Sequence, residues 1–199
     1  MNNRLPTESE IIALHEKYAP SEAIFDAVYS NCQAVWRIAE LVLALKERKI
    51  NEELVKAGCL LHDIGTYKLI QPTDTISVGY VNRGVAGEQI IEEEGLPKAL
   101  GEILAHHVGL GFTKEHIEAT LPLPHRDLTP QTIEERIVTY ASKLHSRSEP
   151  PQFNSVSAYR KHLKNLDAQY YSDLFEALVD EFGEPDLEPL AKEFSQKLA

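Results

Sequence analysis

The 199-residue sequence predicts an all-α protein. Three observations support this fold class. Apolar residues recur at three- and four-residue steps over long segments, which is the period of an amphipathic helix. Residues that favour helix N-caps stand immediately before several of these segments, and glycine or proline follows them. No segment of four to eight residues shows the alternating pattern of a convincing β-strand.

The first predicted helices cover about one third of the chain. Thr7 to Glu10 has the spacing of a capping box, and the helix that it opens is broken at Pro20. Apolar residues at helical spacing then run from Ser21 to Glu47, which indicates one or two amphipathic helices. Asn51 is expected to cap the next helix, which should end near Gly65.

The remaining segments are expected to form a loop followed by further helices. Residues 66–82 contain proline, glycine and alternating polar residues, so they are expected to form a long loop that can cover a pocket. Pro97 is placed for the first turn of a helix, and Thr132 to Glu135 is a second capping box. The expected helices lie at about 84–94, 97–107, from 113 onward, from 133 to 144, and at 155–165, 168–182 and 186–198.

Composition limits the function classes. There are 31 acidic and 20 basic residues, which give a net charge of −11 and work against binding to a nucleic-acid backbone. Cys32 and Cys59 lie in apolar helical patterns without metal-site spacing, as expected for core residues in a reducing compartment. No run of about 18 apolar residues and no basic-then-apolar leader occurs, so a cytoplasmic protein without membrane spans is expected.

The length is that of one domain, spanning residues 1–199. The last fifty residues carry an apolar helical face at Tyr171, Phe175, Leu178 and Phe182. Such a face has to be covered. Packing onto the rest of the chain is the simpler expectation, and self-association as a homodimer is the alternative.

His62 and Asp63 form the most informative pair in the sequence. They follow the apolar helix that contains Gly58 to Leu61 and precede Ile64 and Gly65. A neutral imidazole and a carboxylate are both good ligands for divalent metals, so this helix end predicts one corner of a metal site. The dipeptide alone is more often an ordinary helix end or a hydrogen-bonded core histidine.

The blocks around this pair resemble the HD-domain superfamily of metal-dependent phosphohydrolases. The resemblance covers residues 20–147 and leaves 148–199 as a C-terminal helical extension, expected to pack on the core. The blocks occur in the family's usual order: Asn31 to Val35, Gly58 to Gly65, Arg83 to Gly87, His106 to Gly111, and Glu134 to Lys143.

The resemblance also implies a set of metal ligands that this chain keeps only in part. His62 and Asp63 match the family's His-Asp pair, whereas Asn31 stands where an early His is usual and Ser142 where a late Asp is usual. Arg83 replaces a His that many relatives carry. Amide and hydroxyl oxygens suit magnesium or manganese better than zinc or iron, so a weak site for those ions is expected, with a metal-free protein as the alternative.

Two functions follow from the resemblance. The first is metal-assisted hydrolysis of a nucleotide or other small phosphoester, with metal at His62 and Asp63 and substrate contacts from Arg83, His106 and His107. The second is a degenerate HD domain that binds a small anion, nucleotide or partner without hydrolysis, in which Arg83 pairs with Asp63 and supplies part of the charge of the metal.

Several other polar residues are expected to have no role in the site. His125 lies in a proline-rich loop and is expected to be exposed, and His145 is expected to be structural or exposed. The acidic runs Glu92 to Glu94 and Glu134 to Glu135 are expected to form solvated helix faces. The sequence also lacks a nucleophile elbow and a glycine-rich phosphate loop after a strand.

Overall fold

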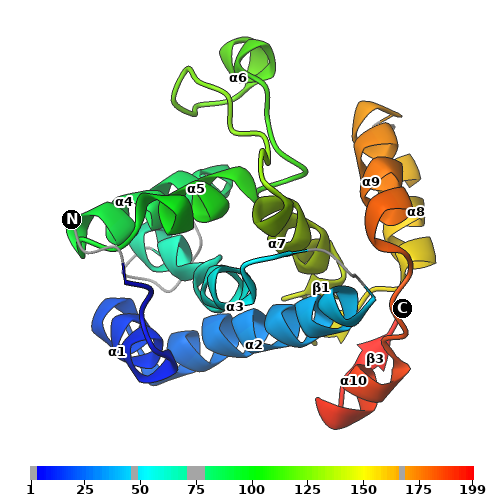
Figure 1. Ribbon diagram of the computed structural model, residues 1–199, viewed down its shortest axis with the longest axis horizontal. Coiled ribbons are helices and arrows are strands. Elements are labelled where there is room, and N and C mark those ends of the chain that lie inside the picture. The colour runs from blue at the N-terminus through cyan, green and yellow to red at the C-terminus, as the bar shows by residue number, and fades with distance from the viewer. Residues whose placement is uncertain (1–3, 46–48, 71–78, 166–168) are drawn as a thin grey trace.

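The computed structural model describes residues 4–45, 49–70, 79–165 and 169–199. The all-α prediction is confirmed, because almost all of the regular structure is helical (Figure 1). The helices are α1 (Glu8–Tyr18), α2 (Glu22–Ala44), α3 (Glu52–Leu61), η1 (Ile64–Leu69), η2 (Tyr80–Asn82), α4 (Arg83–Glu93), α5 (Lys98–His106), α6 (Lys114–Thr120), α7 (Ile133–Lys143), α8 (Val156–Asn165), α9 (Gln169–Phe182) and α10 (Glu188–Glu193).

Three two-residue strands add a small sheet that the sequence pattern did not reveal. They are β1 (His145–Ser146), β2 (Gln152–Phe153) and β3 (Lys197–Leu198). β1 pairs with β2 in antiparallel and β2 with β3 in parallel orientation. Two residues are too few for an alternating pattern, and the β2–β3 pairing joins segments that are distant in sequence, so periodicity could not detect the sheet.

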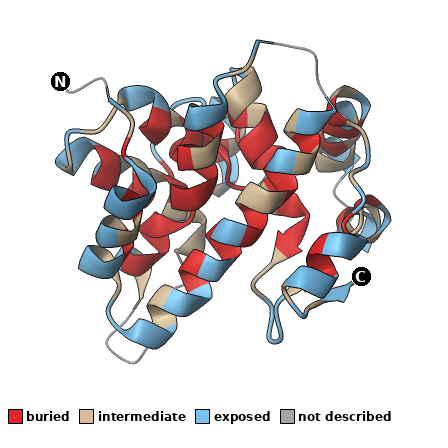
Figure 2. Ribbon diagram, turned by 60° about the horizontal axis from the view of Figure 1, so that its bottom comes forward, coloured by how far each residue is buried: buried red, intermediate tan, exposed pale blue. Residues whose placement is uncertain are grey.

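The core is a bundle in which α2, α3 and α7 pack on one another and the α4–α5 pair packs against α3 and α7 through α5. Figure 2 shows the buried residues concentrated where these helices face one another. Cys32 and Cys59 are fully buried in this core, as expected, and both thiols are free. α6 stands away from the bundle in Figure 1 and belongs to a separate small cluster around Phe112 and Leu128.

Local capping explains where the first helices begin. Thr7 and Glu10 form the predicted capping box, Ser21 caps α2, and Asn51 caps α3 through its side-chain oxygen. α3 ends at Leu61, earlier than predicted, and the chain continues as the 3₁₀ helix η1. Part of the segment expected to be a loop is therefore helical, and its residues 71–78 lie outside the described residues.

The acidic run at Glu134 to Glu135 was predicted wrongly as a solvated face. Glu135 is 4% exposed, and its Oε2 lies 2.7 Å from His106 Nδ1. Glu135 also accepts the backbone N–H of Gln131 at 2.9 Å. A buried carboxylate needs such partners, and the partner His106 comes from another helix, so the sequence run alone did not indicate it.

The C-terminal helices contact the bundle through aromatic side chains. Tyr140 of α7 lies 5.8 Å from Phe175 and 5.7 Å from Phe182, measured between ring centroids. The Tyr140 hydroxyl donates to the Gly183 carbonyl at 2.6 Å. The apolar face noted in the sequence is therefore largely covered within the chain, with Phe175, Leu178 and Phe182 buried. No helix in the described part of the chain is long and apolar enough to span a bilayer.

His15 attaches α1 to the bundle through two buried hydrogen bonds. Its Nε2–H donates to the Leu60 carbonyl, and its Nδ1 accepts from the Tyr67 hydroxyl, both at 2.8 Å. The side chain is completely buried, and this burial lowers the pKa of His15 from 6.5 to about 4. Protonation of His15 would therefore oppose folding.

Acidification is expected to destabilise the protein through this group. Between pH 6.5 and 4 the unfolded chain binds a proton at His15 and the folded chain does not, so the free energy of unfolding falls as pH falls. The full loss at this group is about 3 kcal/mol. In His15→Gln the fall in thermal midpoint between pH 7 and pH 4.5 should be smaller than in the wild type, with the exposed His125→Gln as control. An identical fall in both variants would contradict this.

Candidate functional site

His62 is oriented by its own helix. It is the C-cap of α3, and its Nδ1–H donates to the Cys59 carbonyl at 2.8 Å. The proton is therefore on Nδ1, and Nε2 presents a lone pair 3.6 Å from Oδ2 of Asp63. Burial lowers the pKa of His62 to about 3, which keeps the ring neutral.

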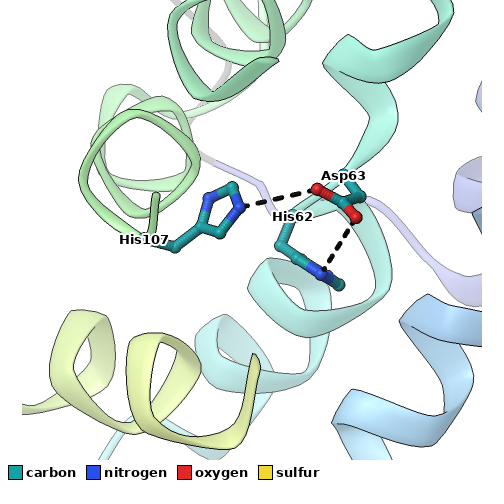
Figure 3. Close-up of side chains that lie close together, drawn as sticks. All are labelled: His62, Asp63 and His107. Carbon is teal, nitrogen blue, oxygen red and sulfur yellow. Dashed lines mark ion pairs between the residues drawn. The ribbon is translucent and has the colours of Figure 1, made fainter. Parts of the chain in front are cut away.

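His107 repeats this arrangement from the end of α5. Its Nδ1–H donates to the Leu104 carbonyl at 2.7 Å, and its Nε2 lies 3.6 Å from Oδ1 of Asp63 without a hydrogen bond inside the described structure. Burial lowers the pKa of His107 to about 4. Figure 3 shows the three side chains pointing toward one another. One potential ligand atom from each residue lies within 4.8 Å of the others, so a His-Asp-His cluster of metal-ligand type is present.

The charge of Asp63 is already balanced by arginine. Arg83 Nε donates to Oδ1 at 2.9 Å, and Arg147 Nε lies 3.3 Å from Oδ2. Burial alone would raise the pKa of Asp63, but Arg147, His62 and Arg83 together hold it well below its usual range. Two guanidinium groups therefore share one carboxylate, and with neutral histidines a positive charge remains at this point.

Asn31 faces the site with its amide nitrogen. Nδ2 donates to Asp63 Oδ2 at 3.1 Å and lies 3.3 Å from His62 Nε2. Its oxygen is turned away and accepts from His145 Nδ1 at 2.8 Å. An amide oxygen next to the Asp63 carboxylate would be repelled, which favours this orientation. The carbonyl that the sequence suggested as a metal ligand is thus directed to His145.

Ser142 and Lys143 are close together at the end of α7. The Ser142 hydroxyl donates to the Thr139 carbonyl at 2.8 Å, and Lys143 Nζ donates to the His107 carbonyl at 2.9 Å. Lys143 is only 7% exposed. Its burial and then the nearby charge of Arg83 lower the pKa of Lys143 to about 7. This amine lies beside the His-Asp-His cluster but supplies no metal ligand while it is protonated.

Apart from Lys143, these residues line one cavity of about 460 Å³. Tyr80 forms part of its wall, with its ring centroid 4.5 Å from Arg83 Cζ and 5.5 Å from Arg147 Cζ. The side chains of Arg83 and Arg147 are 17% and 19% exposed, and both line the cavity. The predicted site residues that line it are Asn31, His62, Asp63, Arg83, His107 and Ser142.

The structure places His106 elsewhere. Its ring is paired with Glu135, as described above, and it does not line this cavity. His125 is exposed on the arm that carries α6, whereas His145 is buried beside Asn31. Sequence reasoning did not include Arg147, Tyr80 or His145 in the site. The only available signal was that Arg147 closely follows the last matched block, and nothing in a single sequence pairs it with Asp63.

Comparison with known proteins identifies the family. The sequence model of the HD domain family matches residues 28–147, which is more than half of the chain. The chain belongs to the HD domain family.

Three relatives are similar over part of their length. An uncharacterized protein of Methanocaldococcus jannaschii is 38% identical over 120 residues, 59% of this chain and 65% of its own length. The tRNA (cytidine(56)-2'-O)-methyltransferase of Thermoplasma volcanium is 31% identical over 79% of this chain and 42% of its own length. The enzyme of the same name from Picrophilus torridus is 28% identical over 70% of this chain and 36% of its own length. The chain spans less than two thirds of each of these relatives.

Two solved structures share the fold. The HD domain of the L. monocytogenes phosphodiesterase PgpH has a TM-score of 0.54 and 15% identity, covering 92% of this chain and 98% of its own. The same domain in complex with cyclic-di-AMP has a TM-score of 0.54 and 16% identity, covering 95% and 99%. This likeness establishes the helical architecture.

The donor set fits the divalent metal usual for the family only in part. His62, Asp63 and His107 offer suitable atoms, and the Nε2 of His107 has no hydrogen bond in the described structure. Asn31 instead presents N–H groups, and two guanidinium groups occupy the Asp63 oxygens. A divalent ion at this position would be repelled by both arginines, and tight binding usually needs three or four oriented ligands. The residues present therefore do not fit a tightly held metal.

Proposed function

We propose that this HD domain binds a small phosphorylated molecule and does not depend on a resident metal to do so. The observation that carries the proposal is the pair of arginines on one buried carboxylate, at the wall of a 460 Å³ cavity. They leave a local positive charge in a protein whose net charge is −11. A phosphate group is the small ligand that best matches such a pair.

The remaining donors of Arg83 support this function. Arg83 uses Nε for Asp63 and Nη1 for the Tyr80 carbonyl at 3.4 Å, and its Nη2 makes no hydrogen bond to the described residues. Asp63 orients the guanidinium group, and the ring of Tyr80 lies against it. A guanidinium group held in this way can donate to a phosphate oxygen with little further loss of conformational entropy. Asp63 thus positions the arginines and Tyr80 covers one side of them.

Binding without hydrolysis is proposed first because both oxygens of Asp63 are paired with guanidinium groups. The neutral histidines still contribute to phosphate recognition in one way. Because His62 and His107 are uncharged, the negative charge of Asp63 pairs with the two arginines. This pairing keeps both guanidinium groups at the cavity wall. The known complex of the PgpH domain with cyclic-di-AMP supports a phosphorylated ligand for a fold of this kind.

Loss of one arginine is expected to weaken phosphate binding. Arg147→Gln retains the pair between Arg83 and Asp63, so the variant should fold. Its Kd for pyrophosphate or AMP, measured by calorimetry, should rise by about tenfold to a hundredfold, because one charge-assisted hydrogen bond is lost. Arg126→Gln removes an arginine from a surface pair with Glu88 and is the matched control. Equal Kd values for Arg147→Gln and wild type, or no binding by the wild type, would contradict the proposal.

A second candidate is a metal-assisted phosphohydrolase, which the His-Asp-His cluster and the unbonded His107 Nε2 favour. Magnesium or manganese would suit its mixed donor set better than zinc or iron. Elemental analysis after purification without chelator separates the candidates. Near-stoichiometric metal that is lost in His62→Ala, together with release of phosphate from a nucleotide panel in added manganese or magnesium, would establish the second candidate and displace the first.

We also propose that the chain is one domain of residues 1–199, with a core at 20–147 and an extension at 148–199. The aromatic contacts of Tyr140 with Phe175 and Phe182 support packing of the extension on the core.

A further inference from the structure

A second cavity of about 470 Å³ adjoins the first. The residues that line both cavities are Arg83, Ser142, His145, Ser146 and Ser148. Arg83 thus lies at the border between two spaces. The walls that are unique to the second cavity include Lys143 of α7 and Tyr159 and His162 of α8.

Lys143 is the charged group buried in that wall. Its side chain is 7% exposed, and Nζ makes one hydrogen bond, to the backbone carbonyl of His107. No carboxylate of the described residues lies within ion-pair distance of Nζ. An ammonium group has three N–H donors, so Lys143 retains donors for another acceptor. A buried cation without a paired anion is costly, and an anionic ligand would offset this cost.

The rest of the cavity wall is mostly polar and uncharged. Among the described residues no Asp or Glu side chain lines it, and its polar walls include Gln152 and Asn154. The terminal residue Ala199 also lies in the wall, where its backbone oxygen accepts the Ser155 N–H at 3.0 Å. Burial raises the pKa of Tyr159 to about 12, so its hydroxyl stays protonated and can donate a hydrogen bond. These residues follow the matched HD segment, which ends at 147. The C-terminal extension therefore contributes a wall that the family segment does not contain.

We infer that Lys143 forms a second anion subsite next to Arg83, so that the ligand is a molecule carrying two separate phosphate groups. One phosphate contacts Arg147 and Arg83 in the first cavity, and the other contacts Lys143 in the second. This inference rests on the proposed function, because the first phosphate is the one already assigned to the arginines. Arg83 lies between the two phosphates and can donate to either.

The test compares two probes, AMP and adenosine 3',5'-bisphosphate, by calorimetry on the full chain. The wild type should bind the bisphosphate at least about tenfold more tightly, since a second charge-assisted contact is made. In Lys143→Met the two probes should bind with nearly equal Kd, at the level of AMP in the wild type. Methionine has a similar length and no charge, so this variant should fold at least as stably as the wild type. Lys161→Met, on the exposed side of α8, is the matched control and should keep the preference.

Each outcome separates the two proposals. Equal affinity of the wild type for both probes would overturn the second subsite and leave the proposed function intact. A bisphosphate preference that persists in Lys143→Met would show that another group reads the second phosphate, which also overturns it. Binding of neither probe by the wild type would overturn the proposed function and the subsite together. Arg147→Gln should weaken both probes by a similar factor, because it acts on the shared phosphate.

Discussion

Replacement of Gly65 by alanine is expected to destabilise this protein by more than about 3 kcal/mol. A Cβ at this position would lie 2.0 Å from the carbonyl oxygen of Arg83 and 2.3 Å from the amide nitrogen of Gly87. Both atoms belong to the backbone of α4, so no side chain can rotate to make room. The contact between η1 and α4 must open, and chemical denaturation with circular dichroism would measure the loss.

The same contact positions the site. Because Gly65 lets the α4 backbone approach η1, the first residue of α4 places its guanidinium group 2.9 Å from Asp63. Any Gly65→Ala protein that does fold should therefore also bind pyrophosphate more weakly than the wild type. Gly101→Ala is the control, because its Cβ would meet the flexible Glu88 side chain at 3.3 Å and alanine favours the helix. Similar stability of the two variants would contradict the close approach.

Restoring the family's ligands is expected to have the largest effect on metal binding. In the triple variant Asn31→His, Arg83→His and Ser142→Asp, the affinity for manganese should rise by about a hundredfold or more. The substitutions remove one guanidinium from Asp63 and replace an N–H donor with a ligand nitrogen. A manganese titration in which electron paramagnetic resonance measures the concentration of free Mn²⁺ would give the change in affinity.

The control for that variant is the same triple change with His62→Ala, which should return the affinity to the wild-type level. The triple variant should at the same time lose affinity for pyrophosphate in the absence of metal, since Arg83 is gone. If the folded triple variant binds manganese no better than the wild type, then Asn31, Arg83 and Ser142 do not occupy ligand positions around Asp63.

Local signals in the sequence predicted the helices well because these signals act over a few residues. The cap at Asn51 and the capping box at Thr7 satisfy backbone N–H groups within one turn, so sequence spacing is enough to identify them. The small sheet and the burial of Glu135 were missed. Each depends on a partner that is distant in sequence, Leu198 for Phe153 and His106 for Glu135.

In the candidate site, too, residues with a local sequence signal were predicted and residues that depend on distant partners were not. His62 and Asp63 could be found because they are adjacent and follow an apolar helix, and the family blocks indicated His107, Arg83, Asn31 and Ser142, which line the same cavity. Arg147 could not be found. Its role depends on an ion pair across 84 positions of sequence, from 63 to 147, and only the path of the chain through α7 and β1 brings the two together.

The sequence by itself determined the helical fold class and the family resemblance, because residue type and short-range spacing carry that information. The tertiary structure decided which groups surround the Asp63 carboxylate. Coulomb attraction in a buried setting pairs Asp63 with Arg83 and Arg147, and hydrogen bonding to His145 turns the Asn31 oxygen away. Those interactions depend on distance in space, so a residue pattern along the chain does not reveal them.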